Sequence, residues 1–248
     1  MRKGLFANSS PLTKIFFSLF AAFATFFIIF FLATLLAVPL YKVNPLEIQS
    51  ILSSPGSGNS LSLLKYFQFA QTLGLFFLPS LIIAYFISYS PGDFLLTSNS
   101  PSFAIYLMVM VSMILALPFI NFLAELNAQM DLPKFMDGIE KWMRQKEDFA
   151  QGITEKLVNV DTHWGLLANL LVMAVMPALG EEFLFRGVFQ RIFINWTKNV
   201  HWGIIISAAL FSFFHFQFFG FIPRMLLGLF FGYLVIWSGS IWPAVVAH

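Results

Sequence analysis

The sequence predicts an all-α fold, a polytopic bundle of transmembrane helices, and two observations carry that prediction. Of the 248 residues, 58% are hydrophobic and only 10% are charged, and the mean hydropathy is +0.80. A typical soluble domain has about 25% charged residues. Several segments also approach or exceed the roughly 20 apolar residues that cross a hydrocarbon core. Such spans must be helices, because lipid cannot satisfy the backbone groups of an open sheet edge.

Cysteine content and net charge exclude several kinds of chemistry and partner. The chain has no cysteine, which rules out disulfides and thiol catalysis. Its formal net charge of +2 is too small to suggest a nucleic-acid partner. The partner that the composition does predict is a lipid bilayer.

The first half of the chain is expected to form three spans. Residues 15–40 follow a basic flank like that of a signal peptide, but their apolar run is too long for one. We expect a second span at residues 63–88, after a loop with glycine and serine, and a third at residues 103–123. Residues 1–124 are therefore predicted to form an N-terminal three-helix membrane region.

A polar connector follows, and it is predicted to contain an amphipathic helix between spans three and four. Residues 125–163 carry five of the fourteen basic residues and eight of the twelve acidic ones. Their apolar residues recur every three or four positions, and Asp131 and Pro133 stand where a helix begins. This helix could lie on the membrane surface and cover or gate an active-site mouth. We favour the alternative, a connector whose apolar face packs on the bundle.

Residues 164–248 are predicted to form the catalytic membrane core. Three apolar stretches occupy residues 165–194, 202–219 and about 222–237, and residues 241–248 resemble the beginning of a seventh span. The chain is therefore expected to be truncated inside a helix. The full protein is expected to have about seven to eight spans.

Two neighbouring carboxylates in the fourth span indicate function. Glu181 and Glu182 lie deep in an apolar stretch, where a charged group is costly and usually faces a protein interior or a water-filled cavity. Neighbours on a helix point about 100° apart, so the two should have different roles. Glu182 precedes Arg186 by four residues, the better order for an ion pair, which leaves Glu181 for chemistry. Pro177 weakens the helix just before them and could open it to water.

Two histidines are the other candidates. His215 stands among aromatic residues, and Phe211, one helical turn earlier, is expected to fix its rotamer. Ser207 or Gln217 could form a hydrogen bond with the imidazole. Taken alone, a membrane histidine is more often a packing residue than a site residue. His248, in the last segment, could not be interpreted alone and becomes a candidate only together with Glu181 and His215.

A glutamate and two histidines on three membrane helices could bind a transition metal such as zinc, or could activate a water directly. The glutamate would act as general base, and a histidine would position the same water or stabilise a developing oxyanion. Hydrolysis of a peptide bond fits these groups. A proton-coupled transporter could use the same residue types, but the spans show neither duplicated halves nor paired broken helices.

The ordered motifs of the last third of the chain resemble a known family. Residues 181–186, Glu-Glu-Phe-Leu-Phe-Arg, resemble the EExxxR motif of the CPBP family of intramembrane endopeptidases, which includes CAAX prenyl proteases and bacterial Abi proteins. Residues 211–215 resemble its FxxxH motif. Residues 242–248 resemble the first half of its last motif, a histidine followed four residues later by Asn or Asp. The resemblance covers about residues 165–248, whereas residues 1–160 have only a compatible hydropathy.

The resemblance implies a helical membrane protease in which Glu181 activates a water with the help of His215. It implies that His248 stabilises the oxyanion or, as the alternative, that Glu181, His215 and His248 hold a divalent metal such as zinc. Three further positions are interpreted as structural support of the site: Glu182, Arg186 and Phe211.

The resemblance also sets the expected substrate and location. The substrate is expected to be a membrane-associated or prenylated (CAAX-type) peptide, although no sequence feature separates a prenyl groove from a peptide groove. The lack of an organelle signal and the similarity to Abi proteins predict a multi-pass protein of the bacterial cytoplasmic membrane. Because some members of the family act without proteolysis, a membrane scaffold or a bacteriocin-immunity protein is the alternative function.

Overall fold

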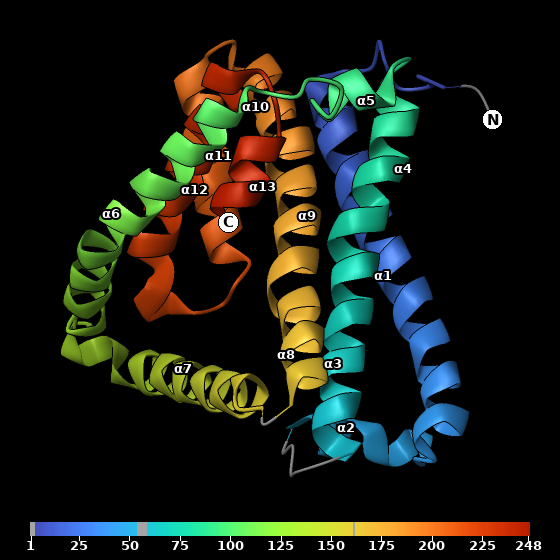
Figure 1. The fold of residues 1–248 in the computed structure, drawn as a ribbon, viewed down its shortest axis with the longest axis vertical. Helices are drawn as coiled ribbons and strands as arrows, with labels where there is room; N and C mark the ends of the chain where they lie inside the picture. The colour runs from blue at the N-terminus through green and yellow to red at the C-terminus, as the bar shows by residue number, and fades with distance from the viewer. Residues whose placement is uncertain (1–2, 54–58, 161) are drawn as a thin grey trace. The chain divides into compact units, whose positions relative to one another are not determined.

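A computed structural model describes residues 3–53, 59–160 and 162–248 of the protein. Every regular element in these residues is a helix, so the all-α prediction is confirmed (Figure 1). The helices pack into two compact units. The first unit comprises Met1–Pro91 and Ile153–Leu184, and the second comprises Gly92–Gly152 and Phe185–His248.

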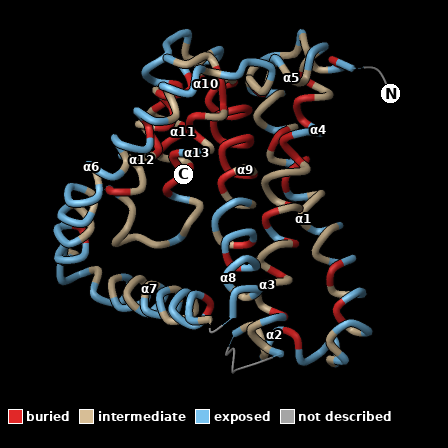
Figure 2. Tube along the Cα trace, in the orientation of Figure 1, coloured by how far each residue is buried: buried red, intermediate tan, exposed pale blue. Residues whose placement is uncertain are grey.

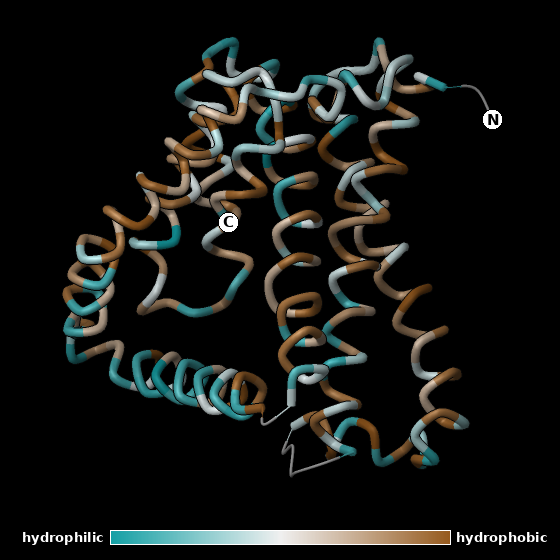
Figure 3. The backbone as a smooth tube through the Cα atoms, in the orientation of Figure 1, coloured by the Kyte–Doolittle hydropathy of each residue, from teal (hydrophilic) through white to brown (hydrophobic). Residues whose placement is uncertain are grey.

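Five helical stretches of the described chain are long and apolar enough to cross a membrane, as expected for a polytopic membrane protein. They are Pro11–Tyr41, Asn59–Ile87, Phe103–Ala128, His163–Thr197 and Phe218–Ser238. Each contains most of a span that the sequence predicts. Figure 3 shows hydrophobic residues along these helices and hydrophilic residues concentrated on α7 (Asp137–Val158).

The apolar stretch at residues 202–219 forms a shorter helix than the sequence predicts. Helix α11 (Val200–Phe213) has 14 residues, fewer than the roughly 20 that cross a bilayer. Phe216 has a φ of 51°, a left-handed conformation that a right-handed helix cannot continue through. The expectation that His215 lies on a helix is therefore wrong, because this residue lies in the turn that follows α11.

In the first unit, α1 (Pro11–Tyr41) packs against α3 (Asn59–Thr72) and α4 (Leu78–Ile87). The buried core between α1 and α3 combines small and large side chains, which include Ala33, Ala37, Leu63, Phe67 and Ala70. A π-helical segment, η2 (Leu73–Phe77), joins α3 to α4. Both α3 and η2 also contact the helix that carries the two glutamates.

That helix, His163–Thr197, includes two π-helical segments, η4 (Leu170–Val175) and η5 (Phe183–Phe189). Segment η4 ends just before Pro177, whose ring lacks a backbone donor and clashes with the preceding turn of an α-helix. A wider π turn relieves that clash. The α-helical part between the two segments, α9 (Met176–Glu182), ends with both glutamates. π-helical turns are found frequently at functional sites.

In the second unit, α11 packs against both α10 (Gln190–Thr197) and α12 (Phe221–Ser238). Helix α12 also contacts α6 (Phe103–Ala128) and α13 (Trp242–Ala247). The buried residues that α6, α12 and α13 share are Val109, Phe231, Leu234, Val235, Ala244 and Ala247. One residue of this core, Phe231, also contacts the ring of His248.

Helices α6 and α7 expose much of their surface, whereas α9 is largely buried (Figure 2). In the most apolar 18-residue stretch of α6, only 6% of the residues are buried. Helix α7 follows a short turn at Lys134–Met136 and lies where the sequence predicts an amphipathic helix, so that prediction is confirmed.

The two units are defined by which helices pack together. The three regions expected from hydropathy, residues 1–124, 125–163 and 164–248, are instead consecutive pieces of the sequence. The two divisions differ most at α6, which follows the first two spans in sequence but packs with α12 and α13.

Candidate active site

Both glutamates expected from the sequence are buried at the end of α9, in the first unit. Glu181 is 9% exposed and Glu182 is fully buried. The preceding residue, Gly180, lies directly against η2, because a Cβ on Gly180 would be 2.9 Å from the Cβ of Phe76. Only glycine permits this approach without a shift of backbone. Gly180 therefore serves the packing of α9.

An aromatic contact follows immediately after the two glutamates. The ring of Phe183 stacks on the ring of Phe77, with centroids 5.7 Å apart and an interplanar angle of 23°. Together with the contact at Gly180, this stacking fixes the rotation of α9 about its axis. The direction in which the Glu181 side chain leaves the helix is thereby fixed as well, which is the preorganisation that a general base requires.

Arg186 is the first motif residue in the second unit, and it is 1% exposed. Its Nη2 donates a hydrogen bond to the carbonyl oxygen of Gly228, at 3.3 Å. Its guanidinium carbon lies 4.4 Å from the centroid of the Phe211 ring and 5.4 Å from that of Phe231. Cation–π contacts of this kind stabilise a desolvated guanidinium by about 2 kcal/mol. The ion pair with Glu182 stays a prediction.

His215 is held by Phe211 through both backbone and ring. The Nδ1 atom of His215 lies 2.8 Å from the carbonyl oxygen of Phe211, and the two ring centroids are 4.8 Å apart in an edge-on arrangement. The expected packing on Phe211 is confirmed. The hydrogen bond comes from a different group than expected, since Ser207 donates to the Phe185 carbonyl and the Gln217 side chain accepts from Arg224.

The contact with a carbonyl oxygen also defines the tautomer of His215. A carbonyl oxygen only accepts, so Nδ1 must carry the hydrogen. In the neutral ring, Nε2 then carries a lone pair and acts as an acceptor rather than a donor. This is the form that water activation needs.

His248 lies against the same phenylalanine as His215. Its ring is edge-on to Phe211, with centroids 6.1 Å apart, and it stacks on Phe231 at 5.7 Å. Both candidate histidines of the second unit thus pack on phenylalanine rings that also contact Arg186. We call these five residues the histidine cluster: Arg186, Phe211, His215, Phe231 and His248.

The turn that carries His215, Phe214–Gly220, is named the histidine loop, and two side chains hold it through three hydrogen bonds. Arg224 donates to both the side chain and the carbonyl of Gln217, at 2.6 and 3.4 Å. The Asn127 side chain donates to the carbonyl of Phe218, at 3.2 Å. A left-handed, bulky residue such as Phe216 is strained, and it persists only where surrounding contacts hold it.

Helix α7 supplies further contacts with the histidine loop. The ring of Trp142 lies 5.6 Å from that of Phe218, and the guanidinium of Arg144 lies 4.4 Å from the centroid of Phe219. Sequence reasoning missed every group that holds the loop. Only Arg224 had a usable signal, since it is a single cation in an apolar stretch.

A metal site in a protein usually needs at least three ligand side chains close together. The described part of the chain holds no group of three or more His, Cys, Asp or Glu residues that could bind a metal ion. Glu181 belongs to the first unit, and His215 and His248 belong to the second.

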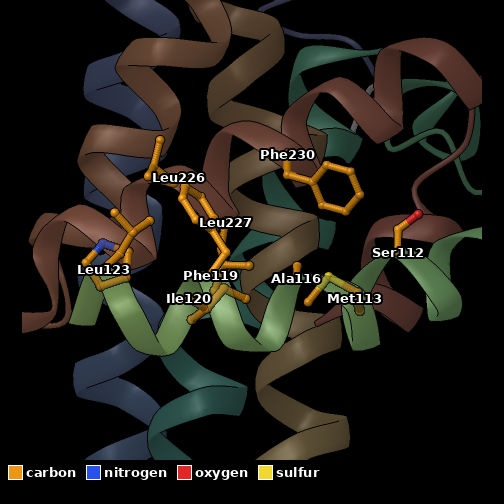
Figure 4. Close-up of a pocket in the computed structure, with 10 residues that line it drawn as sticks. Ser112, Met113, Ala116, Phe119, Ile120, Leu123, Leu226, Leu227 and Phe230 are labelled. Carbon is orange, nitrogen blue, oxygen red and sulfur yellow. The ribbon is translucent and has the colours of Figure 1, made fainter. Parts of the chain in front are cut away.

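An apolar groove lies between α6 and α12 of the second unit (Figure 4). Its volume is about 240 Å³. The residues around it are Ser112, Met113, Ala116, Phe119, Ile120, Leu123, Pro223, Leu226, Leu227 and Phe230. Phe230 is adjacent to Phe231 of the histidine cluster, and their ring centroids are 6.2 Å apart. The groove has no charged lining residue, so it suits an apolar group.

Comparison with known proteins agrees with the motifs. Residues 163–248 match the family model described as type II CAAX prenyl endopeptidase Rce1-like. The matched residues include both glutamates, Arg186, Phe211 and both histidines of the cluster. The match confirms, for this part of the chain, the resemblance to the CPBP family. Neither the curated proteins nor the solved structures gave a match.

Proposed function

We propose that the protein is an intramembrane endopeptidase of the bacterial cytoplasmic membrane that acts on membrane-associated or prenylated (CAAX-type) peptides. The observation that carries the proposal is the match of residues 163–248 to the model of a peptidase family. The five apolar helices support a site within the bilayer. The packing of α9 and the shared ring of Phe211 support the assignment of roles to individual residues.

In the proposed reaction, Glu181 takes a proton from a water while Nε2 of His215 orients that water through a hydrogen bond. The water oxygen bonds to the carbonyl carbon of the peptide, and the carbonyl oxygen becomes an oxyanion. A ring N–H of His248 donates to the oxyanion. The carbon–nitrogen bond then breaks, and Glu181 returns the proton to the leaving amine. The products are a carboxylic acid, which keeps the second proton of the water until it ionises in solution, and a free amine.

The supporting residues act through the catalytic ones. Arg186 holds the ring of Phe211, and Phe211 in turn holds His215 by its carbonyl and His248 by its ring. A histidine fixed in one tautomer and one orientation loses little entropy when the water binds. Glu182 is proposed to balance the buried charge of Arg186.

For the substrate, we propose that its apolar part lies in the groove between α6 and α12. The groove is apolar, and one wall residue, Phe230, neighbours Phe231 of the histidine cluster. A prenyl group or a leucine-rich peptide segment has the matching chemistry. A polar peptide segment does not fit it.

Cleavage by the purified full-length protein tests the function. Wild type and Glu181→Gln are reconstituted in lipid and incubated with a pool of membrane and prenylated peptides, and products are identified by mass spectrometry. Glu47→Gln, the same change at an exposed position, is the matched control. We expect cleavage by wild type and control and none by Glu181→Gln. Equal cleavage by all three would exclude Glu181 as the base.

If no protein cleaves although all are folded, the phenotype of Glu181→Gln in cells decides. An unchanged phenotype would reject the peptidase function and favour the membrane scaffold or bacteriocin-immunity function. A lost phenotype would keep the peptidase and call for other substrates.

Zinc held by Glu181, His215 and His248 is a separate proposal, and elemental analysis of active, purified protein tests it. Active protein without bound metal would reject it. Stoichiometric zinc that is lost in His215→Ala would support it.

A further inference from the structure

Helix α7 exposes a row of large apolar side chains. Phe135, in the turn before the helix, is 86% exposed, and Ile139, Trp142 and Phe149 are 50%, 46% and 47% exposed. All four belong to the second unit. Soluble proteins rarely expose several large apolar side chains together unless these form an interaction surface. We call these four residues the α7 stripe.

The α7 stripe occupies one side of the helix. Its members are separated by four, three and seven residues, spacings that return to the same side at 3.6 residues per turn. Exposed charged residues occupy the opposite side, at Asp137, Lys141 and Asp148. Ile139 and Asp148 are nine residues apart, or two and a half turns, so they point in opposite directions. The exposed surface of α7 thus has an apolar side and a charged side.

The neighbours of α7 in the chain indicate what covers the stripe. The candidate span α6 ends at Ala128, and the next candidate span begins at His163. Both ends of the connector are therefore tied to ends of membrane spans, which lie at a bilayer surface. Lys146, exposed among the stripe residues, can extend its amine towards lipid headgroups while its methylenes stay in the apolar layer.

We propose that the α7 stripe is inserted into the boundary between lipid headgroups and acyl chains, so that α7 lies in the plane of the bilayer surface. The occupant of this surface is lipid. The same helix contacts the histidine loop through Trp142 and Arg144. The bilayer surface thereby supports the segment that carries His215. The proposal is independent of the peptidase function.

Site-directed spin labelling tests the proposal cleanly, because the chain has no cysteine. Ile139→Cys, Phe149→Cys and Asp148→Cys are labelled with a nitroxide and reconstituted in vesicles of phosphatidylcholine and phosphatidylglycerol. Collisions with oxygen, which concentrates in lipid, are compared with collisions with a water-soluble nickel chelate. We expect labels at Ile139→Cys and Phe149→Cys to favour oxygen and the label at Asp148→Cys to favour the nickel chelate.

Two results would overturn the proposal. Labels at positions 139 and 149 that favour the nickel chelate would place the stripe in water. Labels protected from both reagents would mean that protein covers the stripe, either a second copy of this chain or another partner. Two stripe positions are labelled so that one variant that fails to fold, recognised by its elution in detergent, still leaves the other as the test.

Discussion

The carbonyl oxygen of Phe211 binds Nδ1 of His215 at 2.8 Å, while the ring of Phe211 packs edge-on against the imidazole at 4.8 Å. One residue thus controls the tautomer through its backbone and the orientation through its side chain. The two effects can be separated, because substitution of Phe211 removes the ring and leaves the carbonyl.

Phe211→Leu is expected to reduce kcat by about 10- to 100-fold, with a small change in KM, because a misplaced catalytic group slows the chemical step. His215 and His248 would both lose their shared ring contact. Steady-state cleavage kinetics measure the effect. Phe193→Leu, the same change at a buried position of α10, is the control. Equal losses in both variants would show general destabilisation and contradict the positioning role.

Arg224→Ala is expected to lower kcat about tenfold, because the histidine loop loses charge-assisted hydrogen bonds of about 1.5 to 3 kcal/mol. Gln217→Ala should have a smaller effect, since the bond to the Gln217 carbonyl remains. The double variant should be no slower than Arg224→Ala, because the Gln217 side chain acts through its hydrogen bond with Arg224. Steady-state kinetics of the wild type, the two single variants and the double variant give the coupling energy between Arg224 and Gln217. Fully additive losses would mean that Arg224 acts elsewhere.

Gly180→Ala is expected to destabilise the protein by about 1 to 3 kcal/mol, because the new methyl group would overlap the Cβ of Phe76. Gly138→Ala is the matched control, since a Cβ there meets no atom within 4 Å. The control should be neutral or more stable by about 0.5 to 1 kcal/mol. Thermal unfolding in detergent compares them. Unchanged stability of Gly180→Ala would mean that α9 can move away from η2.

Acid is expected to loosen the beginning of α7. The backbone N–H of Leu132 and the guanidinium of Arg144 hold the pKa of the Glu140 carboxyl below its ordinary value of 4.5. A lowered pKa in the folded protein means that the carboxylate stabilises the fold above the unfolded pKa and ceases to do so as the pH falls through the folded value.

Hydrogen exchange at the Leu132 amide, measured as the pH falls below about 4.5 and corrected for intrinsic rates, tests this dependence. Protection should decrease in wild type and should be low at every pH in Glu140→Gln. Constant protection in wild type would show that Glu140 does not hold this turn.

The spans and α7 could be predicted because they depend on composition and on the period of apolar residues, which are local properties. The end of α11 could not. Residues 211–219 are mostly phenylalanine and contain neither glycine nor proline, so no local signal stops the helix before Gly220. The left-handed Phe216 lies just before Gln217 and Phe218, whose carbonyl oxygens accept hydrogen bonds from Arg224 and Asn127, and no local pattern reveals these contacts.

The candidate site shows the same division. Glu181, His215 and His248 could be chosen from the sequence because polar groups in apolar spans are costly and motifs order them along the chain. Phe231 could not, because it is one of 33 phenylalanines and only the fold brings it to Arg186 and His248. Similarly, the partner of Nδ1 on His215 is a backbone carbonyl, a group that every residue possesses.

The burial of Arg186 has a consequence for the order of assembly during synthesis. Its contacts with Phe211, Gly228 and Phe231 come from segments that are translated later than its own helix. An arginine at the centre of a lone span costs about 2.5 to 3.5 kcal/mol on insertion. The helix His163–Thr197 is therefore expected to remain beside the insertion machinery until α11 and α12 emerge, so that these three segments enter the lipid as one unit.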